Sequence, residues 1–190
     1  MRTREGTGGL GKRRGLATRL GVVLAAGLLQ AADGQAKYVI MFIGDGMGLP
    51  QRRAAAEFLK KKLVMTSFPA QGITTTHAAD RFITGSAAAG TAMSSGQKTN
   101  IGVVGMDPHL RPVKTIAEMA KERGMKVGIV SSVSIDHATP ASFYAHVPKR
   151  GQYYDIDVAL AKSGFDYFGG GGLKDPAHKR NNSSNYQGNA

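Results

Sequence analysis

The 190-residue sequence contains no cysteine and no tryptophan. The absence of cysteine excludes a disulfide scaffold, a thiolate zinc site and a cysteine nucleophile. Aromatic residues make up only 7% of the chain and form no stripe on which bases could stack. Hydrophobic residues at 42% and charged residues at 20% nevertheless give an ordinary globular balance, which argues against wholesale disorder.

Acidic residues are scarce relative to basic ones, and the formal net charge is +12. Part of this excess lies in residues 1–36, which leaves 19 basic and 11 acidic side chains for the rest of the chain. These basic residues are scattered, and 60–62 is their only run of three. The scatter disfavours a nucleic-acid-binding surface, although a non-catalytic fragment that binds anions or nucleic acid stays an alternative.

Residues 1–36 have the order of features that is typical of a signal peptide. Residues 1–19 are basic and rich in glycine, Leu20–Leu29 is an uninterrupted apolar run, and small residues follow at Gly34 and Ala36. A membrane span needs about 20 apolar residues, so this run is too short to be one. We therefore expect a periplasmic or secreted protein with no stable membrane anchor.

The rest of the chain predicts strands alternating with helices. Continuous apolar runs, typical of strands buried on both faces, occur at 38–43 and 126–131. A further strand is predicted at 71–77 and a short one at 165–168. Helices are predicted over 50–62, 86–95, 113–123, 142–147 and 154–162. This alternation indicates an α/β fold with a mainly parallel sheet, in which chemistry gathers at the carboxyl ends of strands.

Asp45 directly follows the first apolar run, between Gly44 and Gly46. The glycines allow a sharp turn and leave the carboxylate unobstructed. A carboxylate at the end of a strand is a good ligand for a divalent cation. An ordinary turn aspartate explains the same pattern, and for an isolated Gly-Asp-Gly we favour that interpretation.

Ser86 stands at the start of the predicted 86–95 helix. A serine in this place is usually an N-cap. The positive end of a helix also favours an anion beside the hydroxyl, as a nucleophilic serine would require. Such a serine would still lack a base, and a metal ion on its oxygen could take that role.

A second group of polar residues follows the 126–131 run. His137 and Thr139 are two residues apart and would face the same way in an extended loop, and Arg150 could grip an anion with two hydrogen bonds. Each of these residues has an ordinary structural explanation when taken alone.

Taken in order, these motifs strongly resemble the alkaline phosphatase family. The resemblance covers residues from about 38 to 172 and lies in the motifs Ile43-Gly44-Asp45-Gly46-Met47-Gly48, Ile83–Ala92, Gly96–Asn100, His137–Ala141 and Tyr144–Val147 with Arg150. It implies a three-layer α/β/α sandwich, incomplete in this chain. We predict a signal peptide at 1–36, the N-terminal part of the catalytic domain at 37–172 and a polar end at 173–190.

The resemblance implies a hydrolase that cleaves phosphate monoesters with two Zn²⁺ ions and one Mg²⁺ ion. Ser86 looks like the catalytic nucleophile, which becomes phosphorylated. Arg150 looks like the substrate-binding arginine that holds the phosphate. Asp45 looks like the carboxylate shared between a zinc ion and the magnesium ion, while His137 and Thr139 occupy positions around the magnesium.

Most of the family's zinc ligands have no counterpart here. We therefore expect a truncated form with incomplete zinc sites, and a homodimer of the full-length form stays open. A phosphodiesterase, sulfatase or phosphomutase on the same fold is an alternative, although the sulfatase motif is absent around Ser86.

Overall fold

The computed structural model describes residues 36–179. The chain divides into two compact units, Met1–Ile43 and Gly44–Ala190. In the first unit, residues 36–43 form no helix or strand, and the side chains of Tyr38, Ile40 and Phe42 are 78%, 77% and 89% exposed. The doubly buried strand predicted at 38–43 is therefore wrong for the described residues. Such a strand needs hydrogen-bonded neighbours and a covering layer on each face, and these residues have neither.

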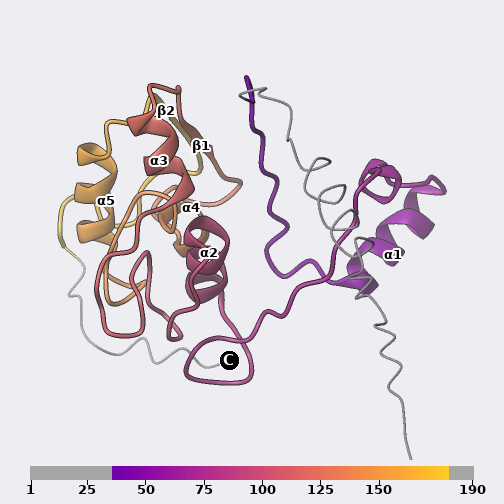
Figure 1. Ribbon diagram of the computed structural model, residues 1–190, viewed down its shortest axis with the longest axis horizontal. Coiled ribbons are helices and arrows are strands. Elements are labelled where there is room, and N and C mark those ends of the chain that lie inside the picture. Colours follow the sequence, from indigo (N-terminus) through magenta and orange to yellow (C-terminus); the bar gives the residue numbers. More distant parts are fainter. Residues whose placement is uncertain (1–35, 180–190) are drawn as a thin grey trace, which may run out of the picture. The chain divides into compact units, whose positions relative to one another are not determined.

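Among residues 36–179, the helices and strands lie in the second unit (Figure 1). Its helices are α1 (Leu49–Leu59), the 3-10 helix η1 (Val64–Ser67), α2 (Ser86–Ser95), α3 (Ile116–Glu122), α4 (Ala138–Ala141) and α5 (Tyr153–Lys162). Four of them fall inside or within a residue of helices predicted from the sequence. The exceptions are η1 and α4.

Two further predicted elements are absent from the second unit. Residues 71–77 form no strand, and their side chains are exposed, so their β-branched residues gain no packed neighbours. The helix expected at 142–147 does not form, and the helix nearest to it, α4, ends at Ala141. The chain beyond it instead approaches Val104, which exchanges backbone hydrogen bonds of 3.0 and 2.9 Å with Val147.

The ends of two helices have clear local causes. Gly96 closes α2 in the left-handed conformation, with φ of 74°, as the sequence predicted. Helix α3 begins three residues later than expected, because Thr115 is its N-cap. The Thr115 hydroxyl accepts from the backbone N–H of Glu118 at 3.1 Å, and the Glu118 carboxylate accepts from the N–H of Thr115 at 2.7 Å.

The strands β1 (Gly128–Val130) and β2 (Tyr167–Gly169) form a parallel pair, with Ile129 opposite Phe168. Helix α5 lies between them in the sequence, as a parallel connection requires. Val130 and Tyr167 are 73% and 61% exposed. The expectation that 126–131 is buried on both faces is therefore wrong within the described chain, where the sheet has two strands.

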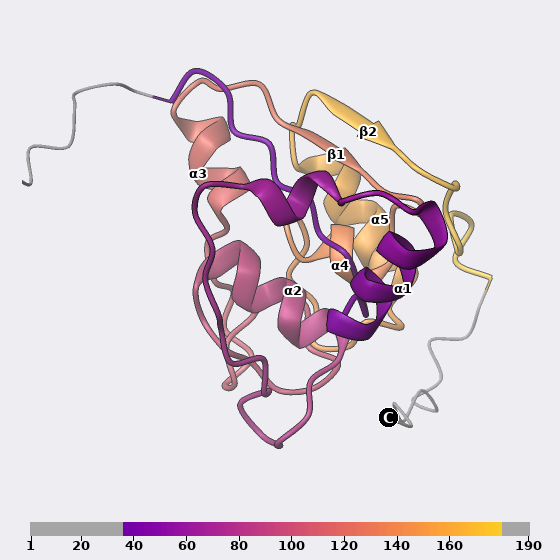
Figure 2. The ribbon, with the colours of Figure 1, turned by 90° about the vertical axis from the view of Figure 1, so that its right-hand side faces the viewer.

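The core of the second unit lies where α2 and α4 pack against each other (Figures 1 and 2). Small side chains allow this close approach, and larger apolar residues complete the core from the segments that follow. Its buried members are Ala87, Val104, Ala138, Ala141, Tyr144, Ala145, Val147 and Ile156. Tyr144 meets the ring of Phe168 edge-on at 5.3 Å, which ties β2 to this core.

The predicted signal peptide lies outside the described residues except for Ala36, and so does most of the predicted polar end, from 180 onward. Among the described helices, none has the length and apolar character needed to cross a lipid bilayer.

Candidate active site

The site forms around the carboxylate of Asp45. A turn places this side chain in solvent, with the N–H of Met47 donating to the carbonyl of Gly44 at 3.1 Å. Gly46 has φ of 68°, a conformation that side chains rarely adopt, so the glycine after Asp45 is required by the turn. The two oxygens of the Asp45 carboxylate accept hydrogen bonds from residues far away in the sequence, which an ordinary turn aspartate does not do.

The first of these donors is Ser86, whose hydroxyl lies 3.1 Å from Asp45 Oδ1. Ser86 is the first residue of α2, and the N-cap is Gly85, which has no side chain to cap the helix. The hydroxyl of Ser86 is therefore not used for capping. It lies at the positive end of a ten-residue helix, where negative charge on its oxygen is favoured.

The second donor is Thr139 on α4, whose hydroxyl donates to Asp45 Oδ2 at 2.8 Å. His137, two residues before Thr139, is the N-cap residue of α4. The sequence analysis had instead placed both residues in an extended loop. Burial, followed by the positive charges of Arg150 and Lys174, lowers the pKa of His137 below its ordinary value. His137 is thus held as neutral imidazole, the form that binds metal ions.

Arg150 also reaches this site. Its guanidinium lies 3.2 Å from His137 Nε2, and its backbone N–H donates to the carbonyl of Gly102 at 2.7 Å. A guanidinium can only donate, so Nε2 is the acceptor and the ring proton belongs on Nδ1. The five residues singled out in the sequence therefore form two hydrogen-bonded groups, one centred on Asp45 and one on His137.

Two buried residues near His137 in the sequence form hydrogen bonds that were not predicted. Asp136 is fully buried, and its Oδ2 accepts from the backbone N–H of Lys174 at 2.5 Å. Tyr144 donates to the carbonyl of Ile135 at 2.6 Å. The charge of Asp136 was visible in the sequence, but its contact with Lys174 joins positions 38 residues apart, and no local pattern indicates such a pair.

The donor atoms of the site match only part of the metal set that the resemblance implies. The carboxylate of Asp45 and the hydroxyl of Thr139 are hard oxygen donors, which suit Mg²⁺. His137 offers no free lone pair in the same arrangement, because Nε2 accepts from Arg150 and the buried Nδ1 carries the ring proton. In residues 36–179 no group of three or more His, Cys, Asp and Glu side chains is arranged to hold a metal ion. The described donors thus fit part of a magnesium shell and do not fit two complete zinc sites, each of which needs about four ligands.

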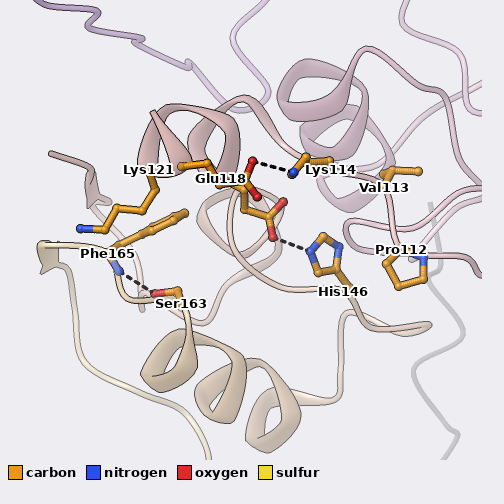
Figure 3. Close-up of a pocket in the computed structure, with 9 residues that line it drawn as sticks. Pro112, Val113, Lys114, Glu118, Lys121, His146, Ser163 and Phe165 are labelled. Atoms are coloured by element: carbon orange, nitrogen blue, oxygen red, sulfur yellow. Dashed lines mark hydrogen bonds and ion pairs between the residues drawn. The ribbon is translucent and has the colours of Figure 1, made fainter. Parts of the chain in front are cut away.

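A pocket of about 380 Å³ lies elsewhere in the second unit (Figure 3). Several of its polar groups are paired with one another: Glu118 with His146 at 2.8 Å, and Lys114 with Glu122 at 2.6 Å. Burial alone would raise the pKa of the Glu118 carboxyl, but hydrogen bonds from Thr115 and His146 bring it below its ordinary value. None of the predicted site residues lines this pocket. The contact between Glu118 and His146 links α3 to the segment that follows α4.

Comparison with known proteins supports the family resemblance found in the sequence motifs. The family model described as alkaline phosphatase matches residues 36–169. Alkaline phosphatase 4 of Drosophila melanogaster is 34% identical over 148 residues, which are 69% of this chain and 25% of that protein. The alkaline phosphatase of Escherichia coli strain K12 is 37% identical over 132 residues, 64% of this chain and 28% of that protein.

Solved structures give the same answer. The alkaline phosphatase of the Antarctic bacterium TAB5 superimposes with a TM-score of 0.61 at 36% identity, covering 65% of this chain and 36% of that one. A variant of the TAB5 enzyme described with Mg bound in its M3 site has a TM-score of 0.58 at 34% identity, covering 62% and 34%. The chain belongs to the alkaline phosphatase family. It has a partial α/β fold of that type and spans about a quarter to a third of its curated relatives.

Proposed function

We propose that this chain carries the nucleophile-bearing part of an alkaline phosphatase, which hydrolyses phosphate monoesters through a phosphoserine at Ser86. The observation that supports this most directly is the convergence of two hydroxyls, from Ser86 and Thr139, on the carboxylate of Asp45. These residues come from three separate motifs of the family resemblance. Ordinary turn, capping and helix-surface roles would not bring them together.

In the proposed reaction, Ser86 Oγ attacks the phosphorus atom of the ester and the bond between phosphorus and the alcohol oxygen breaks. Ser86 gives up its proton, and the departing oxygen gains one and leaves as the alcohol. Water then hydrolyses the phosphoserine and releases phosphate. The hydrogen bond to Asp45 orients Ser86 Oγ, and the N-terminus of α2 favours the negative charge that develops beside it. Arg150 binds the non-bridging oxygens of the phosphate, a geometry that suits a guanidinium.

The proposed metal set is two Zn²⁺ ions and one Mg²⁺ ion. Asp45, Thr139 and His137 are the residues of this chain that would surround the magnesium, and Asp45 would also be offered to one zinc ion. Bound divalent cations supply charge stabilisation and lower the pKa of an oxygen nucleophile. The proposal also includes export to the periplasm or the medium, because residues 1–36 have the pattern of a signal peptide.

The test is covalent trapping of phosphate. A form of the chain extended in frame with the C-terminal part of the E. coli relative is supplied with Zn²⁺ and Mg²⁺ and incubated with ³²P-phosphate at acid pH. We expect acid-stable label on Ser86. Ser86→Ala should remove the label and lower kcat for p-nitrophenyl phosphate by about 10³-fold or more, because the nucleophile is lost.

Ser95→Ala is the matched control, since Ser95 lies on the same helix and its hydroxyl donates to the carbonyl of Thr91 at 2.7 Å. This variant should keep both label and turnover. Label that persists in Ser86→Ala contradicts the proposal. A clear preference for a phosphodiester or a sulfate ester over the monoester would favour a related hydrolase on the same fold.

A further inference from the structure

Gly90 on α2 lies against Ser142, the C-cap residue of α4. A Cβ atom added to Gly90 would lie 2.7 Å from Ser142 Oγ and 3.0 Å from Ser142 Cβ. It would also lie 3.6 Å from the backbone Cα of Thr139, which is ordinary contact. Since non-bonded heavy atoms prefer about 3.5–4.0 Å, only glycine permits this spacing of the helices.

Ser142 cannot simply rotate away from a larger neighbour. It is fully buried, and its hydroxyl donates to the carbonyl of Ala138 at 2.7 Å. Its own carbonyl accepts from the hydroxyl of Ser94, on α2, at 2.6 Å. A side chain at position 90 would therefore push the helices apart or break a buried hydrogen bond, which is costly.

This contact lies one helical turn from the candidate active site. Gly90 is four residues after Ser86 on α2, and Ser142 is three residues after Thr139, so each pair shares a helix face. Ser86 and Thr139 in turn donate to the two oxygens of one carboxylate, at 3.1 and 2.8 Å. A change in the separation of the helices at Gly90 and Ser142 would therefore also move the hydroxyls of Ser86 and Thr139 relative to Asp45.

We propose that Gly90 and Ser142 are positioning residues, whose contact sets the separation of α2 and α4 and so holds Ser86 in its place beside Asp45. The catalytic part of this inference rests on the proposed role of Ser86, while the geometric part does not. A displacement of about 1 Å can lower a catalytic rate about a hundredfold, so a small change in helix separation should be visible in turnover.

The geometric part is tested on the 190-residue chain by NMR. We expect Gly90→Ala to shift the amide signals of Ser86 and Thr139 and the carboxyl ¹³C signal of Asp45. Ser142→Gly in the same chain should return these signals towards their original positions, because it removes both atoms that crowd position 90. Gly72→Ala is the matched control, since nothing lies within 4 Å of a Cβ added there.

The catalytic part is tested in the extended, metal-loaded form with p-nitrophenyl phosphate. Gly90→Ala should lower kcat about ten- to a hundredfold with a smaller change in KM, and Ser142→Gly should restore most of it. Recovery of kcat in the double variant separates positioning from a general loss of stability. Each single change disturbs packing, so two changes that only lowered stability would lower kcat further when combined.

The inference is overturned if Gly90→Ala leaves the signals and kcat unchanged, or if the double variant shows no recovery. If Gly90→Ala does not fold, the double variant is the test. Restored folding and turnover in the double variant would support the inference, and their absence would overturn it. Failure of the proposed function gives a different result. The phosphate label would then persist in Ser86→Ala, while the NMR shifts of Gly90→Ala would still appear.

Discussion

Individual serine residues on one helix have different roles because of what their hydroxyls reach. On α2, Ser94 and Ser95 donate to backbone carbonyls, at 2.6 Å to Ser142 and 2.7 Å to Thr91, so their hydroxyls are committed to packing. Ser86 donates to a carboxylate that comes from 41 residues earlier in the chain. At the residue scale, this difference in partner is what makes Ser86 the candidate nucleophile.

Asp157 is a residue whose burial predicts a pH effect. Both of its carboxyl oxygens are buried and form no hydrogen bond within the described residues. Burial, and then the negative charges of Asp136 and Asp175, raise the pKa of Asp157 to about 6. Because the folded state holds this proton more tightly than the unfolded state, stability is fully present below about pH 4 and falls as the pH rises through about 6.

We therefore expect Asp157→Asn to raise the free energy of unfolding at pH 7.5 by about 1–2 kcal/mol, because the variant never carries the buried charge. At pH 4 the variant and the original chain should be nearly equal. Urea unfolding between pH 4 and pH 8 measures the difference. A gap between the two proteins that does not change with pH would contradict this explanation. Asp155→Asn, on the same helix, is the control.

At the scale of elements, α3 shows how a local signal fixes a boundary. Thr115 and Glu118 form a capping box, with reciprocal hydrogen bonds of 3.1 and 2.7 Å. The spacing Thr-Ile-Ala-Glu is visible in the sequence and would have placed the helix start correctly. The Thr115 hydroxyl also donates to the carbonyl of Phe143 at 2.8 Å, a contact between distant residues that no local pattern indicates.

Thr115→Ala should lower the free energy of unfolding by about 2 kcal/mol, because it removes the cap and leaves the buried carbonyl of Phe143 without its donor. Thr115→Ser keeps the hydroxyl and should lose much less. Urea unfolding midpoints at constant pH give the comparison. Equal losses in the two variants would show that the methyl group, and not the hydroxyl, stabilises this end of the helix.

The strands show the opposite case, in which local patterns were not enough. Continuous apolar runs predicted double burial at 38–43 and 126–131, yet Ile40 is 77% exposed and Val130 is 73% exposed. Apolar runs indicate which residues are suited to a buried sheet. Their burial depends on neighbouring strands and covering helices, which belong to the assembled fold and not to the run itself.

At the scale of the whole molecule, Asp45 and His137 are the carboxylate and the imidazole that the described residues would offer to the proposed metal site. We expect the 190-residue chain alone, even with Zn²⁺ and Mg²⁺ added, to hydrolyse p-nitrophenyl phosphate at a negligible rate, because serine without bound cations is a weak nucleophile. The extended form should be active and lose its activity with EDTA. Zinc-dependent turnover by the chain alone would contradict this prediction.

The sequence by itself determined the family, the presence of helices α1, α2, α3 and α5, and the identities of the candidate site residues Asp45, Ser86, His137, Thr139 and Arg150. These features depend on local motifs and on the residues that begin or end helices. Only the tertiary structure decided that Ser86 and Thr139 share the carboxylate of Asp45, and that Gly90 lies against Ser142. Those contacts join positions between 41 and 94 residues apart, and side chains at such separations meet only after packing brings their elements together.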